Sequence, residues 1–125
     1  MKRDPRLIPF SQEHHGALKL SLKLQNAPTD EATAELLLAE REGLLTHFFE
    51  EEQLIIPILN SMSSSGALLL QFLNDHRDLR HLLTENDPAT YVELGKRLNS
   101  HTRFEERELF PAIEAYWAKV EAGME

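Results

Sequence analysis

The sequence predicts an all-α fold, an antiparallel up-down four-helix bundle, from three observations. Turn-forming residues divide the chain into four long segments rich in Ala, Leu, Glu, Gln, Lys and Arg, which favour helices. Period-two alternation, the pattern of a half-buried strand, is absent from these segments. The connections between them are short, and short connections place consecutive helices antiparallel.

The first two predicted helices occupy residues 11–26 and about 29–60. Ser11 is a suitable N-cap for the first, and an extended segment at residues 7–10 is expected to precede it. Thr29 or Asp30 caps the second. Pro57 lies in the last turns of this helix, where a missing N–H and a bulky ring predict a kink or an early end.

The last two predicted helices occupy about residues 66–84 and 88–121. The small residues before Gly66 form the turn that starts the third. Asp87 is the predicted N-cap of the fourth, and Pro88 stands at its first helical position, where proline is favoured. Leucines and phenylalanines three and four residues apart give each helix one apolar stripe.

Composition limits the function and the location of the protein. A length of 125 residues fits one compact domain, so we expect residues 1–125 to form a single domain. The 13 basic and 21 acidic residues give a net charge of −8, which argues against nucleic acid as a partner. No membrane partner is expected, because no segment approaches the roughly 18 apolar residues of a spanning helix. The polar N-terminus lacks an apolar signal core, so a cytoplasmic location is predicted.

The second and fourth helices carry the same signature, shifted by 54 residues. His47, Glu51 and Pro57 in one match His101, Glu105 and Pro111 in the other. The first and third helices match with a shift of 62, which aligns His14 with His76. Each half therefore carries one histidine on its first helix and His-x-x-x-Glu on its second. The bundle is expected to have an internal two-fold pseudo-repeat.

This spacing is suited to holding metal ions. Residues i and i+4 of a helix lie one turn apart and about 40° around its axis, so His47 and Glu51 point the same way. A carboxylate can bridge two cations, whereas an imidazole binds one. With no cysteine in the chain, imidazole and carboxylate are the strong ligands that remain. We predict a two-metal site whose ligands are His14, His47, Glu51, His76, His101 and Glu105.

Other interpretations of these residues were weighed. A single histidine on an apolar helix face is more often a hydrogen-bonded core residue than a ligand. Repetition at matched positions favours ligation here, because burying an unpaired carboxylate costs several kcal/mol. Either His14 or His15 is able to face inward, and the repeat alignment favours His14. Four further glutamates are interpreted as surface charges in preference to partners of an imidazole N–H; they are Glu50, Glu52, Glu106 and Glu108.

Nitrogen and oxygen ligands without sulfur fit iron or manganese better than zinc, which prefers a closed tetrahedral site. His-x-x-x-Glu-Glu followed by proline, present twice beside separate histidines on the other two helices, resembles the hemerythrin-like family, or HHE cation-binding domain. The resemblance extends from about Ile8 to Trp117. It implies two iron ions bridged by oxo or hydroxo groups and by Glu51 and Glu105, with zinc or manganese as alternatives. It assigns His14 and His47 to one iron and His76 and His101 to the other.

One position departs from the family pattern. Oxygen-carrying hemerythrins have a further histidine one turn after the third-helix ligand, and here that residue is Arg80. The nearby His81 lies about 140° around the helix from His76 and is expected to point away. The resemblance therefore implies a role like that of the bacterial hemerythrin-like proteins linked to nitric oxide, oxygen or peroxide responses, not an oxygen carrier.

The predicted function is a non-haem di-iron protein that binds, senses or reacts with dioxygen, nitric oxide or peroxide. A metal-stabilised regulatory interaction module without redox chemistry is the alternative. A zinc or manganese hydrolase is disfavoured, because the sequence shows no separate general base or substrate cleft.

Overall fold

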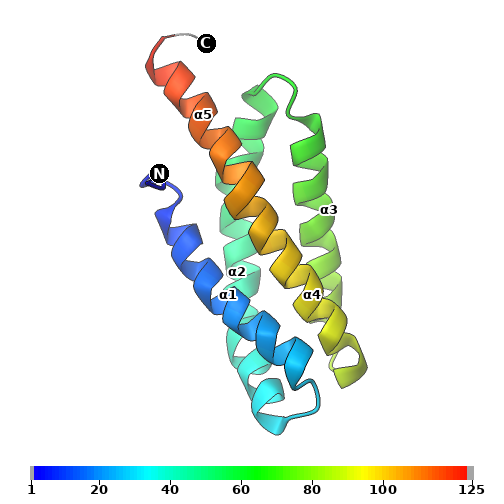
Figure 1. The fold of residues 1–125 in the computed structure, drawn as a ribbon. Coiled ribbons are helices and arrows are strands. Elements are labelled where there is room, and N and C mark those ends of the chain that lie inside the picture. Colours follow the sequence, from blue (N-terminus) through cyan, green and yellow to red (C-terminus); the bar gives the residue numbers. More distant parts are fainter. Residues whose placement is uncertain (1, 124–125) are drawn as a thin grey trace.

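The computed structural model describes residues 2–123, and helices are the only regular elements in that range (Figure 1). They are α1 (Ile8–Asn26), α2 (Glu31–Ser61), α3 (Gly66–Leu83), α4 (Pro88–Phe104), the π-helical turn η1 (Glu105–Leu109) and α5 (Phe110–Glu121). Because α4, η1 and α5 follow one another without a break, four helical rods run alternately up and down. This confirms the predicted all-α four-helix bundle. Residues 1, 124 and 125 of the predicted single domain lie outside the described range.

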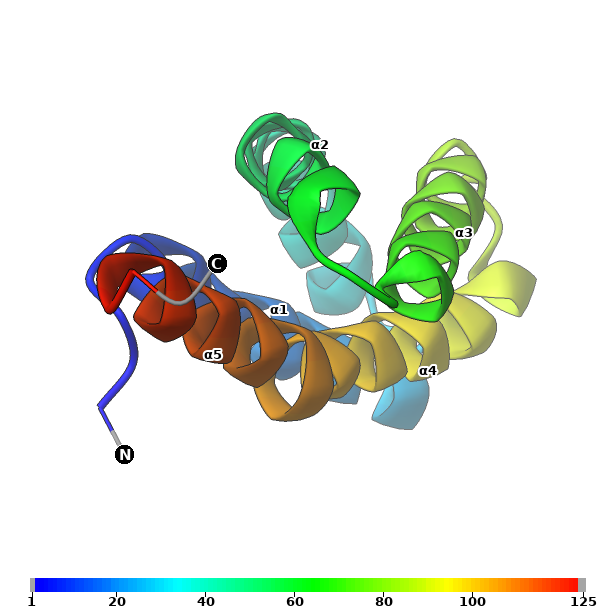
Figure 2. The ribbon, with the colours of Figure 1, turned by 90° about the horizontal axis from the view of Figure 1, so that it is seen from above.

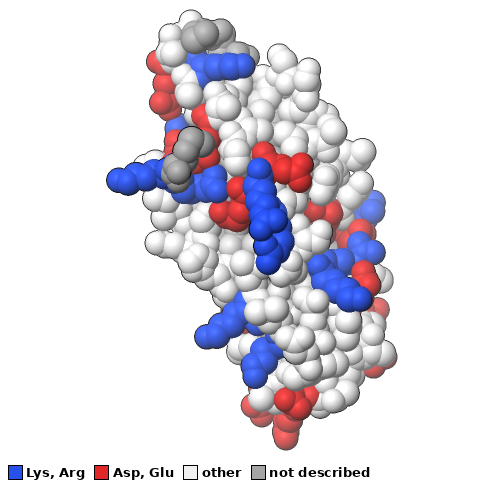
Figure 3. Space-filling view, viewed as in Figure 1, with Lys and Arg blue, Asp and Glu red and all other residues white. Residues whose placement is uncertain are grey.

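Each rod packs against its neighbours in the chain, and α4 returns to pack against α1 (Figure 2). The α1–α4 contact is close at Gly95, where a Cβ atom would lie 2.7 Å from the carbonyl oxygen of Ser21. Glycine is therefore needed at this position. On the face formed by α1, α4 and α5, basic and acidic side chains are interspersed (Figure 3). Among residues 2–123, no helix has both the length and the apolar character required to cross a membrane.

The start of α1 differs from the prediction. Residues 8–10 are helical and not extended, so the helix begins three residues before Ser11. Pro9 lies in the first turn, where its missing N–H removes no intrahelical hydrogen bond. The carbonyl of Asp4 accepts hydrogen bonds from the N–H groups of Leu7 and Ile8, at 2.9 and 3.2 Å, which starts the turn.

The two aligned prolines have different local structures. Helix α2 continues past Pro57 to Ser61, so the predicted early end is wrong, and a kink there stays a prediction. Before Pro111, the backbone instead widens into η1, in which the N–H of Phe110 bonds the carbonyl of Glu105, five residues back. A proline ring clashes with the carbonyl four residues before it in an α-helix, and the wider turn relieves that conflict. The last rod therefore has the predicted range of 88–121, but it contains a π-helical turn that was not predicted from the sequence.

The predicted N-cap of the last rod is confirmed. The Asp87 carboxylate accepts a hydrogen bond of 3.0 Å from the N–H of Ala89, and Pro88 stands in the first turn.

Two buried apolar clusters fill the bundle, one towards each end. One contains Leu20, Leu24, Leu44, Phe48, Leu79, Leu94 and Leu98, and the other contains Phe10, Ile55, Phe72, Phe104, Leu109, Phe110 and Trp117. Along every rod, the predicted ligands lie between a residue of the first cluster and a residue of the second. Hydrophobic burial on both sides thus positions a polar layer in the middle of the bundle.

Candidate metal centre

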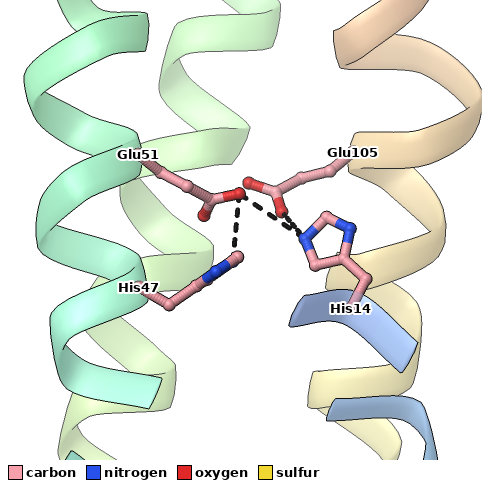
Figure 4. A group of neighbouring side chains, drawn as sticks. All are labelled: His14, His47, Glu51 and Glu105. Atoms are coloured by element: carbon pink, nitrogen blue, oxygen red, sulfur yellow. Dashed lines mark hydrogen bonds and ion pairs between the residues drawn. The ribbon is translucent and has the colours of Figure 1, made fainter. Parts of the chain in front are cut away.

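The six predicted ligands lie together in this middle layer, and all are buried. Helix α1 contributes His14, α2 contributes His47 and Glu51, α3 contributes His76, α4 contributes His101, and η1 contributes Glu105. Figure 4 shows four of them, with the carboxylates of Glu51 and Glu105 approaching each other from opposite rods above two imidazoles. The i, i+4 spacing therefore directs both side chains of α2 to the same interior point, as predicted.

The carboxylate of Glu51 faces both halves of the site. Its Oε2 atom lies 3.1 Å from Nε2 of His47 and 3.5 Å from Nε2 of His14. Its Oε1 atom lies 3.2 Å from Nε2 of His76. One carboxylate group therefore presents one oxygen to the histidines of the first half and the other oxygen to the second half.

Glu105 divides its oxygens in the same way. Oε1 lies 2.8 Å from Nε2 of His14, whereas Oε2 lies 3.1 Å from Nε2 of His101 and 3.8 Å from Nε2 of His76. The result is two groups of closely spaced ligand atoms that share both glutamates: His14, His47, Glu51 and Glu105, and Glu51, His76, His101 and Glu105. Each group has two imidazoles and two shared carboxylates, an arrangement able to hold one metal ion.

The inner carboxylates are incompletely satisfied by protein groups. Both oxygens of Glu51 and Oε2 of Glu105 are buried without a well-directed hydrogen bond. A buried carboxylate lacking a partner costs several kcal/mol, and a cation is the partner that removes this cost. The donor set and its unpaired oxygens thus fit a pair of metal ions.

Each imidazole is also held from outside by a carboxylate at its Nδ1 atom. The pairs are His14 with Glu106 (2.7 Å), His47 with Glu13 (2.7 Å), His76 with Glu52 (2.8 Å) and His101 with Asp75 (2.9 Å). A histidine that donates its Nδ1–H outward presents the Nε2 lone pair inward, as metal ligation requires. The four pairs obey the pseudo-repeat, since shifts of 62 and 54 residues exchange them two by two.

The four outer carboxylates include two whose predicted role was wrong and two for which no role was predicted. Glu52 and Glu106 were interpreted as surface charges, but each bonds a histidine of the site. Glu13 and Asp75 had no predicted role. The signal that could have found them is their position directly before His14 and His76 in the aligned helices.

Arg80 does not contact the inner ligands but fixes an outer carboxylate. Its Nη1 and Nη2 atoms donate to Oε2 and Oε1 of Glu52, at 2.6 and 2.8 Å. In the other half, Glu106 accepts hydrogen bonds from Arg3 at 3.1 Å and from Ser11 at 2.7 Å. A guanidinium group therefore supports one outer carboxylate in each half.

Ionisation in the metal-free protein follows from this network. Burial lowers the pKa of His14, but the hydrogen bond to Glu105 and the nearby carboxylate of Glu51 outweigh burial and raise the pKa to about 10. For His101, burial is likewise outweighed by the charge of Glu105 and the hydrogen bond to Asp75, and the pKa rises to about 10. Burial raises the pKa of Glu105, yet the surrounding imidazoles hold it well below its usual value.

Aromatic rings enclose the histidines on the apolar sides. Phe110 stacks on His14 with ring centroids 5.6 Å apart, and His76 lies 4.3 Å from Phe72 and 4.7 Å from Phe48. Such packing fixes ring orientation and excludes water from the site.

The two remaining histidines lie outside the centre. His15 is exposed, so the structure brings His14 and not its neighbour into the layer. The His81 side chain is 77% exposed, which confirms that it points away from the site.

Comparison with known proteins agrees with this geometry. The model of the hemerythrin HHE cation-binding domain matches residues 9–113, a range that includes all six inner residues. No curated protein and no solved structure matches the chain. The match covers well over half of the sequence, and the chain therefore belongs to the hemerythrin HHE cation-binding domain family.

Proposed function

We propose that the protein holds two iron ions and that it binds, senses or reacts with a small oxidant such as dioxygen, nitric oxide or peroxide. The proposed ligands are His14, His47, Glu51, His76, His101 and Glu105, within a single hemerythrin-like domain. The observation that carries the proposal is the pair of buried glutamates whose unpaired oxygens face two histidines on either side.

The excess of carboxylates over cationic side chains around the site favours the binding of more than one cation. Two inner and four outer carboxylates surround the four imidazoles, whereas the cationic groups that contact these carboxylates are Arg3 and Arg80. When the imidazoles are neutral, negative charge is in excess. Two divalent or trivalent cations bound among these oxygens would balance the excess negative charge.

Iron is favoured over zinc by the chemistry of the donors. Each half offers two nitrogens and two shared oxygens without sulfur, and zinc prefers closed four-coordinate sites. Manganese has similar preferences and is the alternative to test beside iron. A bound iron pair would supply open positions for a small ligand and one-electron redox chemistry. The protein's part is to orient the imidazoles through their Nδ1 atoms and to exclude water with Phe48, Phe72 and Phe110.

Elemental analysis with optical spectroscopy tests the proposal. Protein expressed with ample iron is expected to carry two irons per chain and to show ultraviolet charge-transfer bands that change on adding azide, nitric oxide or peroxide. The matched variants are His76→Ala, which should lose iron, and His81→Ala, which should not. Less than one iron per chain and no response to these ligands would overturn the proposal.

A metal-stabilised interaction module is the second candidate, favoured by exposed apolar side chains. Phe49 is 58% exposed on α2 and Leu70 is 62% exposed on α3. If docking through such residues is the function, Phe49→Ser should abolish it while the iron content and the spectra stay unchanged.

A further inference from the structure

A groove between α1 and α2 leads from the surface to one half of the metal centre. It encloses about 250 Å³, and its lining includes Glu13, Gly16, Glu40, Gly43 and His47. We call it the α1–α2 groove. Its inner end is His47, which is 5% exposed. The opposite side of this imidazole faces Oε2 of Glu51 at 3.1 Å, one of the buried oxygens without a hydrogen bond.

The two glycines keep this groove open. A Cβ atom at Gly16 or Gly43 would meet no heavy atom within 4 Å, and neither residue has a positive φ. Neither close packing nor backbone conformation requires glycine here, in contrast to Gly95. Glycine inside a helix is destabilising relative to alanine. The structural effect of these two residues is therefore the space that they leave.

The corresponding place in the other half is narrower. The pseudo-repeat aligns Gly16 with Asp78 and Gly43 with Arg97. Arg97 donates to Asp78 at 3.1 Å, so an ion pair stands where the first half has two glycines. The cavity beside His101 at this place encloses about 80 Å³. The two halves thus have nearly the same inner ligands but differ in access.

The charge of the groove selects what enters it. Its lining holds two carboxylates, the exposed Glu40 and Glu13 beside His47, and no lysine or arginine. The Glu13 side chain is 50% exposed and bonds Nδ1 of His47 at 2.7 Å, so it contacts both the solvent and the site. Carboxylates that line a cleft attract cations and repel anions.

We propose that the α1–α2 groove is the route by which divalent metal ions reach the centre, with Glu40 and Glu13 as transient ligands. The inference rests on the proposed function, since it assumes a cation pair at Glu51 and Glu105. It predicts that cations reach the position between His14 and His47 directly, and that they reach the other position from there.

Uptake kinetics test the route. Metal-free protein is mixed anaerobically with Fe²⁺. Samples taken at intervals are added to a chromogenic chelator, and the decrease in the Fe²⁺ that the chelator can bind gives the rate of uptake by the protein. Gly43→Leu fills the groove and is expected to slow uptake at least tenfold while the final iron content stays at two per chain. The matched control is Arg97→Leu at the aligned position, which removes the ion pair and should take up iron at least as fast as the unmodified protein.

Glu40→Gln provides a second test that does not depend on packing. It removes one exposed negative charge from the groove lining and is expected to slow uptake severalfold at low salt, with the difference shrinking as ionic strength rises. If Gly43→Leu and Glu40→Gln both load at the unmodified rate, the groove is not the route, although the metal centre stands. If the unmodified protein binds no iron, the proposed function itself fails.

Discussion

The outer carboxylates should control the affinity of the metal centre, and Glu52→Gln tests this most directly. Glu52 accepts a hydrogen bond from Nδ1 of His76 and two from Arg80. Glutamine preserves the size of the side chain but removes its charge and replaces one acceptor oxygen with a donor group. That donor must then face either the imidazole N–H or the guanidinium, so one of these contacts is lost.

The size of the effect follows from the geometry. Glu52 is 14% exposed, so solvent screens its contacts only partly. Removing an outer partner of a metal-bound histidine typically weakens metal affinity about 10- to 100-fold, which corresponds to about 1.4 to 2.8 kcal/mol. The loss should fall on the ion between His76 and His101, because Glu52 does not contact the histidines of the other half.

A titration with Fe²⁺ buffered by a chelator measures both ions separately. The Glu52→Gln protein is expected to retain one ion at free Fe²⁺ concentrations at which the unmodified protein holds two. Glu50→Gln is the matched control, since it removes the same charge from an exposed residue two positions earlier. Equal titration curves for the two variants would refute the assigned role of Glu52.

Four further predictions concern stability and specificity. His14 has a pKa of about 10 in the folded metal-free protein against the ordinary 6.5. Its contribution to the free energy of unfolding is therefore complete below about pH 6.5 and is lost as the pH rises through 10. The denaturant concentration at the unfolding midpoint of the metal-free protein should decrease between about pH 7 and 10. His15→Ala should leave the iron content unchanged, because this side chain is exposed. Phe72→Ala, at a fully buried site, should cost about 3–5 kcal/mol in urea unfolding. Gly95→Ala should cost about 1–3 kcal/mol in the same assay, because the Ser21 carbonyl cannot rotate away from the added methyl group.

The positions of the inner residues could be predicted because they depend on local geometry and on repetition. The i, i+4 spacing fixes the common direction of His47 and Glu51 whatever the neighbouring helix does. The repeat then places a second such pair opposite the first. The one ambiguity, between His14 and His15, concerned the rotation of a whole helix, and the buried residues of α1 resolve it.

The outer carboxylates could not be assigned in the same way. Glu13 bonds a histidine of α2, and Asp75 bonds a histidine of α4, so each contact crosses between rods. Such contacts depend on the distance and rotation between two helices, which helical periodicity does not specify. Glu50 and Glu52 are equally acidic in sequence, and only the packing of α3 against α2 brings Glu52 to His76.

The local backbone at the two prolines is likewise not predictable from the sequence. Pro57 and Pro111 occupy aligned positions, yet one lies in an α-helix and the other follows a π-helical turn. A proline lacks an N–H and its ring needs space, but these requirements alone do not determine which of the two backbones forms. The π-helical turn begins at Glu105 itself, so the widened backbone sets where this carboxylate enters the site.

The pseudo-repeat is therefore strict at the inner ligands and relaxed around them, and this difference makes the two metal positions unequal. Arg80 on α3 aligns with Leu18 on α1, so the support of Glu106 comes instead from Arg3, outside the helices. Ion pairs narrow the approach to the position between His76 and His101, whereas the position between His14 and His47 borders the larger α1–α2 groove. Two ions held by equivalent ligands and equivalent outer carboxylates should then differ in exchange rate more than in affinity. The ligands and their outer carboxylates set the affinity, whereas the width of the approach sets the rate at which an ion enters or leaves.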